Sequence, residues 1–274
     1  MYLEHWYLRE KPFENTPDPK FMYYAKGHEE ALIRLLYATK ELKGSMLLTG
    51  GYGCGKTVLS RVFLNELIAT GKYEIALVTN PKFSANELLA ELIYQLGGGE
   101  TPGKNKVELL QLFNNLVYKN LARGKETVVI VDEAQAIDDL DSFEELRLLL
   151  NFQRNDRFLL TLILVGQPEL RDKLKKLPQL RQRLLIGYHL DNLDEDDTYG
   201  YIYHRLSVAG TERAIFTAEA VREIYRSSNG IPRVINGMAD LALLKGCMSR
   251  RTIIDAETVT KVARDINLDQ ECLV

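Results

Sequence analysis

The hydrophobic residues of the chain fall into two patterns, short continuous runs and longer stretches with a helical period. The runs show no alternation of apolar and polar positions, which is typical of parallel strands covered on both faces. The longer stretches predict amphipathic helices between the runs. Strands that alternate with helices predict an α/β fold with a doubly wound, parallel, five-stranded sheet. The strands are expected at Met46–Leu48, Ile75–Val78, Thr127–Val131, Phe158–Val165 and Leu185–Leu190.

Capping residues place several helix ends in this part of the chain. Ser84 and Glu87 have the spacing of a capping box at a helix start. Gly71 is expected to end the helix before it, because glycine readily adopts the left-handed conformation found there. Residues 142–145 are expected to cap another helix, and a short basic helical region is expected over residues 171–183.

The composition changes at Asp191, where acidic residues cluster, and only helical periods follow. We expect four helices there, one over residues 194–209, one after Thr217, one from Pro232 and one after Asp255. The chain is therefore expected to form two domains. The first, an α/β domain with an extended N-terminal lead-in, covers residues 1–190, and the second, a small all-helical domain, covers residues 191–274.

Overall composition narrows the function classes only a little. A net charge of -3 and a pI near 5.9 give no general attraction to nucleic acid or anionic membranes, so any such binding has to be local. Three cysteines without metal-ligand or disulfide spacing favour a reducing compartment. No segment approaches the roughly 20 apolar residues of a membrane span, and the first ten residues do not resemble a signal peptide. We therefore expect a cytoplasmic protein without a membrane span.

A glycine-rich segment follows the first expected strand and leads directly into an expected helix. Residues 50–57 read Gly-Gly-Tyr-Gly-Cys-Gly-Lys-Thr, which fits G-x-x-x-x-G-K-[ST]. This order of elements predicts a phosphate-binding loop, because glycines let backbone N–H groups surround an anion and the helix adds its positive end. The alternative is a glycine turn followed by a chance Lys-Thr pair. We expect the nucleotide to contact Gly50, Gly51, Tyr52, Gly53, Cys54, Gly55, Lys56, Thr57 and Val58.

Individual residues of this loop have expected roles. The Lys56 side chain is expected to reach the β- and γ-phosphates, and the Thr57 hydroxyl is expected to ligate Mg²⁺. Cys54 is expected to serve only as a small side chain, the alternative being an oxidisable thiol beside the phosphates.

Polar residues also follow two later strands. Asp132 and Glu133 follow the third strand, where Asp132 is expected to hold Mg²⁺ through water and Glu133 to polarise the water that attacks the γ-phosphate. An acidic pair that merely caps a helix is the alternative. Gln167 follows the fourth strand and is expected to orient the attacking water. The alternative for Gln167 is a loop amide that satisfies backbone groups.

Two basic features lie further along the chain. A solvated face is the usual interpretation of a basic run, but a run just before the fifth strand is also where a neighbouring subunit's phosphate would lie in a ring. Residues 230–233, Gly-Ile-Pro-Arg, begin a helix with proline in its first turn. Pro232 and Arg233 are expected to contact the nucleotide, with Arg233 directed at the γ-phosphate. The basic run consists of Arg171, Lys173, Lys175, Lys176, Arg181 and Arg183, opposed only by Asp172.

Together these blocks resemble an AAA+ ATPase of the general secretion pathway protein A family. The resemblance covers nearly the whole chain, and its later blocks are more specific than the phosphate loop. The blocks are Met1-Tyr2-Leu3, Lys11-Pro12-Phe13, Thr16-Pro17-Asp18-Pro19, Asp132-Glu133-Ala134-Gln135, Val165-Gly166-Gln167-Pro168-Glu169-Leu170, Leu180-Arg181-Gln182-Arg183-Leu184 and Gly230-Ile231-Pro232-Arg233-Val234-Ile235-Asn236.

The resemblance implies ATP and Mg²⁺ as ligands, a helical lid and assembly into a homo-oligomer. Larger family members continue into a membrane span and a peptidoglycan-binding module, which this sequence lacks, so no direct role at the cell wall is expected. The implied sites are Walker A at residues 50–57, Walker B at Asp132 and Glu133, sensor 1 at Gln167, sensor 2 at Arg233, and an arginine finger at Arg183 or Arg181.

Two functional classes follow. One is an ATPase that drives or switches the assembly of a secretion or pilus machine through protein partners. The other is an ATP-dependent DNA-binding regulator, for example of transposition, because shorter relatives of similar build resemble transposition and origin-recognition ATPases. A third class, a degenerate nucleotide-binding scaffold, is disfavoured because every hydrolytic position is filled. The negative net charge disfavours the DNA-binding class, whereas the basic run, repeated around a ring of subunits, favours it.

Overall fold

The computed structural model describes residues 1–155 and 157–271, so Cys272 lies outside the described residues. The chain forms two compact units, each with a hydrophobic core of its own. Unit 1 comprises Met1–His28, Tyr52–Val58 and Asp191–Val274, and unit 2 comprises Glu29–Gly51 and Leu59–Leu190. The assignment of residues 1–190 and 191–274 to a nucleotide-binding domain and a lid stays a prediction.

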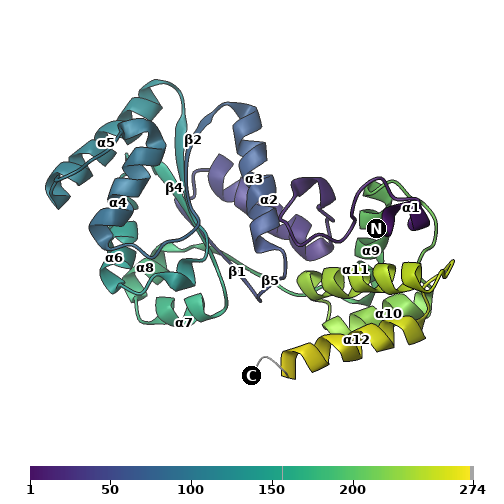
Figure 1. Cartoon of the computed structure of the whole chain (residues 1–274). Helices are drawn as coiled ribbons and strands as arrows, with labels where there is room; N and C mark the ends of the chain where they lie inside the picture. The colour runs from purple at the N-terminus through teal and green to yellow at the C-terminus, as the bar shows by residue number, and fades with distance from the viewer. Residues whose placement is uncertain (156, 272–274) are drawn as a thin grey trace. The chain divides into compact units, whose positions relative to one another are not determined.

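Unit 2 is built on a five-stranded sheet in which every pair of neighbouring strands is parallel (Figure 1). The strand order is β2-β3-β4-β1-β5, so β4 lies between β3 and β1. All five strands lie where the apolar runs predicted them. They are β1 (Ser45–Gly50), β2 (Tyr73–Val78), β3 (Glu126–Val131), β4 (Leu160–Gly166) and β5 (Ile186–Leu190).

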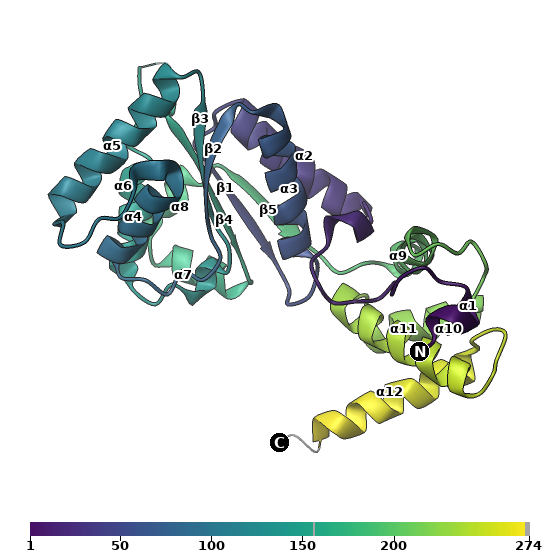
Figure 2. The ribbon, with the colours of Figure 1, turned by 45° about the horizontal axis from the view of Figure 1, so that its top comes forward.

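Helices cover both faces of the sheet. Helices α2 (Lys26–Lys40) and α3 (Lys56–Thr70) lie on one face, and five helices lie on the other (Figures 1 and 2). The main core of unit 2 forms between the sheet and the second group, where Phe113, Phe143 and Leu162 are fully buried. That group consists of α4 (Ala85–Ile93), α5 (Lys106–Ala122), α6 (Leu140–Leu149), α7 (Glu169–Lys175) and α8 (Pro178–Arg183).

The capping box at Ser84 and Glu87 is present as predicted, but the cap predicted at residues 142–145 is wrong. Helix α6 begins earlier, and Asp139 caps it through the backbone N–H of Asp141. Ser142 lies inside the helix, where its hydroxyl donates to the carbonyl of Phe83. The basic region over residues 171–183 is two helices, because Pro178 starts a new helix.

Unit 1 is helical. Helices α9 (Glu195–Val208) and α10 (Ala218–Ser228) begin where helices were expected, and the side chains of Asp194 and Thr217 cap them. The N-terminal segment packs against the helices of this unit, since the indole N–H of Trp6 donates at 2.9 Å to the carbonyl of Leu243 in α11 (Pro232–Met248). The buried Arg205 side chain donates to the carbonyl of Glu14 at 3.0 Å. The elements are α1 (Leu3–Trp6), a 3₁₀ turn (Pro19–Phe21), α9 (Glu195–Val208), α10 (Ala218–Ser228), α11 (Pro232–Met248) and α12 (Ala256–Glu271).

Within residues 1–155 and 157–271, no helix combines the length and apolar character that a membrane crossing requires.

Candidate nucleotide site

The carboxyl ends of three parallel strands meet at one edge of the sheet. Strand β4 lies between β3 and β1, and its last residue, Gly166, pairs with Thr49 near the end of β1. Asp132 follows β3, Gln167 follows β4, and the glycine-rich loop follows β1. In open α/β sheets, ligands bind at this edge of the strands. The fold therefore brings the starts of the three predicted motifs to the edge where a ligand is expected.

The tip of the glycine-rich loop requires glycine at two positions. Gly53 and Gly55 have φ values of +78° and +102°, in the region that L side chains rarely adopt. A Cβ on Gly53 would lie 2.8 Å from Cβ of Arg233, and one on Gly55 would lie 2.8 Å from Nε2 of His28. Both sterics and backbone conformation therefore exclude other residues from these positions.

His28 contacts the backbone of this loop through its side chain. Its side chain is buried, and Nε2 lies 3.0 Å from the carbonyl oxygen of Cys54. Burial lowers the pKa of His28, so the ring is neutral at pH 7 and Nε2 carries the proton donated to that carbonyl. This role was not predictable from the sequence, because a histidine near a helix start has no spacing that indicates contact with a loop distant in the chain.

Helix α3 begins at Lys56, directly after the glycine-rich loop, so its positive end faces that loop. Lys56 is 5% exposed, and its Nζ lies 3.9 Å from Sγ of Cys54. Burial raises the pKa of the Cys54 thiol, although Lys56 opposes this shift. The thiol is therefore protonated at pH 7, which fits a small buried side chain better than a reactive group.

Arg233 lies against the loop tip within unit 1. Its guanidinium donates to the hydroxyl of Tyr52 at 2.6 Å and lies 4.9 Å from the centre of that ring. Its backbone N–H donates to the carbonyl of Gly53 at 3.3 Å. Pro232 lies in the first turn of α11, as predicted. The N–H of Arg233 also lies in that turn, where a helix offers its backbone donors no internal acceptor, so it is available for this contact.

Glu133 adopts an unusual backbone conformation at the end of β3. Its φ and ψ are 51° and 35°, the left-handed region, which costs a non-glycine residue free energy and clusters at functional sites. Its N–H donates to Oδ1 of the buried Asp132 at 2.8 Å. The Glu133 carboxylate accepts hydrogen bonds from Nε2 of Gln135 and, at 3.4 Å, from Nε2 of Gln167. The structure thus brings together the two residues predicted to act on the attacking water.

A family model described as "AAA domain" matches residues 39–174. The chain is 40% identical over 248 residues to general secretion pathway protein A from Aeromonas hydrophila, which covers 89% of this chain and 44% of that protein. It is 29% identical over 112 residues to a potential ATP-binding protein from Staphylococcus aureus, covering 40% of this chain and 39% of that one. The chain thus spans less than half the length of either curated relative.

The chain belongs to the AAA+ ATPases, in the family of general secretion pathway protein A.

Several solved structures share the fold of this AAA+ chain. The ORC2 protein of Aeropyrum pernix, in ADPNP and ADP complexes, superposes with a TM-score of 0.68 at 18% identity, over 93% of this chain and 71% of that one. Cdc6p of Pyrobaculum aerophilum gives 0.72 at 16% identity, over 90% and 70%. The RuvB branch migration motor of Thermotoga maritima gives 0.58 at 18%, over 89% and 70%. At these identities the likeness supports the α/β nucleotide-binding fold alone.

In the basic run of this AAA+ ATPase, Lys173 and Arg183 are partly buried, and the other four basic side chains are exposed. Lys173 points inward and donates to the carbonyls of Gln135 and Ile137, both at 2.7 Å. Arg183 donates to the side chain of Asn151 at 3.0 Å, whereas Arg181 is exposed. Which of the two arginines is the finger therefore stays a prediction.

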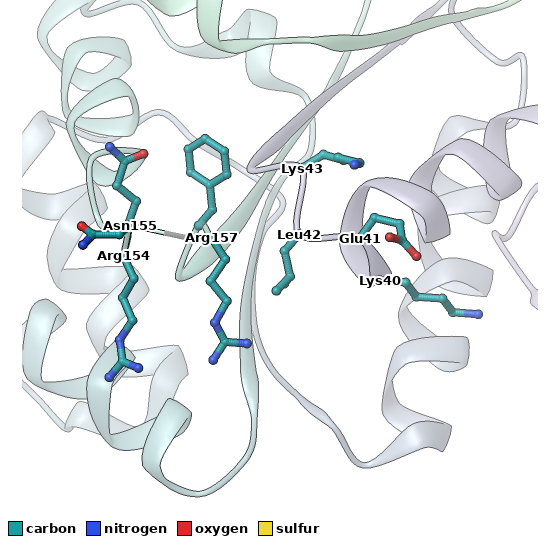
Figure 3. A pocket seen from close by; sticks show the side chains of 9 residues that line it. Lys40, Glu41, Leu42, Lys43, Arg154, Asn155 and Arg157 are labelled. Atoms are coloured by element: carbon teal, nitrogen blue, oxygen red, sulfur yellow. The ribbon is translucent and has the colours of Figure 1, made fainter.

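A pocket of about 580 Å³ lies away from the predicted site, at the opposite edge of the sheet (Figure 3). One wall is the connection from α2 to β1, with Lys40 and Lys43, and the other precedes β4, with Arg154 and Arg157. Both connections enter the amino ends of their strands. The pocket is therefore lined by none of the predicted site residues.

Proposed function

We propose that this AAA+ ATPase binds ATP at residues 50–58 and hydrolyses it with Glu133 as the base that polarises the attacking water. The observation that carries the proposal is the position, backbone conformation and hydrogen bonding of Glu133. Its carboxylate follows a buried strand, is held in a strained backbone conformation and accepts hydrogen bonds from two amides. A general base has to be oriented in this way before it can take a proton from water.

The other predicted residues take roles that fit their positions. Lys56, buried at the start of α3, compensates phosphate charge. Gln167 orients the attacking water together with Glu133. Pro232 places Arg233 at the positive end of α11, beside the loop tip, where a guanidinium binds phosphate oxygens through paired N–H groups.

Magnesium is the metal that the donor set fits. Mg²⁺ commonly takes only one or two protein oxygens and completes its shell with water and substrate phosphates. Thr57 and Asp132 supply one hydroxyl and one carboxylate, and the described residues contain no cluster of three or more histidine, cysteine or acidic side chains that would suit a different metal. When bound with ATP, Mg²⁺ would neutralise phosphate charge.

We propose further that ATP binding promotes a homo-oligomer in which Arg183 or Arg181 contacts a neighbour's ATP, and that this assembly drives or switches a secretion- or pilus-type process through protein partners. The identity to general secretion pathway protein A over 89% of this chain supports the secretion role. Arg181 is exposed and Arg183 is partly exposed, as a contact with another subunit requires.

A second candidate is an ATP-dependent regulator that binds DNA. The exposed side chains of Arg171, Lys176 and Arg181 favour it, and one structural neighbour, the ORC1 protein of Aeropyrum pernix, is described in complex with DNA. A salt titration of DNA binding, with and without a non-hydrolysable ATP analogue, separates the candidates. A steep loss of affinity with salt, seen only with the analogue, would favour DNA. No binding at low salt would favour protein partners.

Two variants test the core proposal. Lys56→Ala should lose ATP binding or turnover without unfolding. Glu133→Gln should bind ATP and Mg²⁺ yet stall, because an amide cannot accept the proton of the water. Wild-type turnover in either variant would overturn the corresponding assignment.

A further inference from the structure

Gln135 contacts both residues that the proposed mechanism places on the attacking water. Its Nε2 donates to the Glu133 carboxylate, and its Oε1 accepts from the backbone N–H of Gln167 at 2.9 Å. One side-chain amide thus ties the end of β3 to the end of β4. The sequence showed Gln135 only as part of a family block, and no pattern within the chain predicted these two partners.

The surrounding structure fixes the position of this amide. Gly166 ends β4, and a Cβ at that position would lie only 2.7 Å from Oε1 of Gln135. The missing side chain at Gly166 therefore leaves the space that Gln135 occupies. From the other side, Lys173 donates to the carbonyls of Gln135 and Ile137, which holds the short turn Ala134–Ala136 against α7.

We propose that Gln135 is a positioning residue, which orients the Glu133 carboxylate and fixes the Gln167 backbone so that both act on the same water. The proposal rests on the proposed function, because it requires Glu133 to be the base. A carboxylate has several rotamers, and Glu133 additionally lies in a strained backbone conformation. Without the amide, the carboxylate would sample orientations that cannot take the proton from the water.

The predicted effect is on turnover and not on binding. Gln135→Leu removes both hydrogen bonds with little change in volume, so kcat should fall about 10- to 100-fold, the loss expected when a catalytic group is misplaced by about 1 Å. KM for ATP and affinity for a non-hydrolysable analogue should stay within about twofold, because Gln135 is not proposed to touch the nucleotide.

A second variant separates orientation from folding. Gln135→Glu keeps an acceptor for the Gln167 N–H but replaces the donor facing Glu133 with a negatively charged oxygen. It should retain the turn and yet lose at least as much turnover as Gln135→Leu. If Gln135→Glu keeps the wild-type kcat, the hydrogen bond to Glu133 is not needed and the proposal is wrong.

Gln95 provides a matched control. This glutamine also bridges two segments, accepting from the N–H of Leu77 at 2.6 Å and donating to the carbonyl of the same residue at 2.9 Å, and it has no assigned role in the chemistry. Gln95→Leu should lower thermal stability and leave kcat near wild type. Equal kcat losses in Gln95→Leu and Gln135→Leu would show a merely structural role and overturn the proposal.

Glu133→Gln, measured in the same experiment, distinguishes this inference from the proposed function. If Glu133→Gln retains only a small, measurable fraction of the wild-type turnover, the proposed function stands whatever Gln135 does. Combining Glu133→Gln with Gln135→Leu should then cause no further loss, since the orienting residue would have no base to orient. A further loss of tenfold or more in the double variant would show that Gln135 acts independently of Glu133.

Discussion

Gly230→Ala should destabilise unit 1 by about 3 to 6 kcal/mol, and the structure divides this loss into separate causes. Gly230 has a φ of +69°, and an alanine held in that conformation loses about 1–2 kcal/mol. Its Cβ would also lie 1.9 Å from the carbonyl oxygen of Leu193. Relief of that overlap costs about 1–3 kcal/mol as overpacking and breaks the hydrogen bond from the Leu193 N–H to the Gly230 carbonyl, worth about 1 kcal/mol.

Gly71 isolates the conformational part of this cost. Its φ is +66°, nearly the same as that of Gly230, but nothing lies within 4 Å of the position that its Cβ would take. Gly71→Ala should therefore cost only about 1–2 kcal/mol. The difference between the two variants measures the steric contribution of the Leu193 carbonyl together with the lost Leu193–Gly230 hydrogen bond.

Urea unfolding gives the comparison directly. Trp6 is the only tryptophan in the sequence and is buried in the core of unit 1, so its fluorescence follows that unit, while circular dichroism follows all the helices. Gly230→Ala should lower the midpoint of the Trp6 transition, and Gly71→Ala should leave it nearly unchanged. If the two variants lose the same free energy of unfolding by circular dichroism, the reasoning from the Leu193 contact is refuted.

Three further predictions concern acid stability, assembly and the arginine finger. Hydrogen bonds from Thr258 lower the pKa of Asp255 to about 2, so its contribution to stability should be complete above its ordinary value of 3.8 and disappear as the pH falls toward 2; Asp255→Asn should flatten this part of an acid titration followed by fluorescence, and an unchanged titration would contradict the assignment. Light scattering should show larger particles with a saturating ATP analogue than without, and a monomer in both conditions at tens of micromolar, in order of magnitude, would count against the oligomer. Arg183→Ala should bind ATP but lose turnover, by up to about 10³–10⁵-fold, and mixing it with Glu133→Gln subunits should restore activity. If Arg181→Ala shows this loss and recovery in place of Arg183→Ala, Arg181 is the finger. If activity does not recover in assemblies shown to contain both subunits, the arginine acts in its own site.

The strands were predictable because burial on both faces leaves a continuous apolar run in the sequence. Helix starts were predictable where one cap residue stood alone, as at Ser84 and Thr217. The start of α6 was placed wrongly because Asp139 and the segment 142–145 both offer cap residues within one turn, and tertiary packing of Ser142 decides between them. Local signals of this kind cannot be ranked without the contacts that surround them.

The residues of the candidate site were also predictable only where local sequence signals were sufficient. The loop glycines and the acidic pair follow strands in the order that their chemistry needs, so the sequence alone predicted them. The hydrogen bonds of His28 and Gln135 could not be predicted, because each joins residues from different elements through one particular side-chain orientation. The approach of Tyr52 to Arg233 spans 181 positions of the sequence and depends on how α11 packs in unit 1.

The docking of the first residues onto the last helices has a consequence for the nascent chain. Trp6 and Leu243 are 237 positions apart, so the N-terminal segment emerges from the ribosome long before its binding surface exists. At typical rates of synthesis this interval is roughly 10–50 s. During that time the apolar side chains of Tyr2, Trp6 and Leu8 lack the helical part of the core in which they are buried. Transiently exposed apolar surface of this kind favours aggregation, which is one reason why chaperones exist. All five strands lie within residues 45–190, so the sheet can form before Leu243 is synthesised, and folding can begin in the middle of the chain.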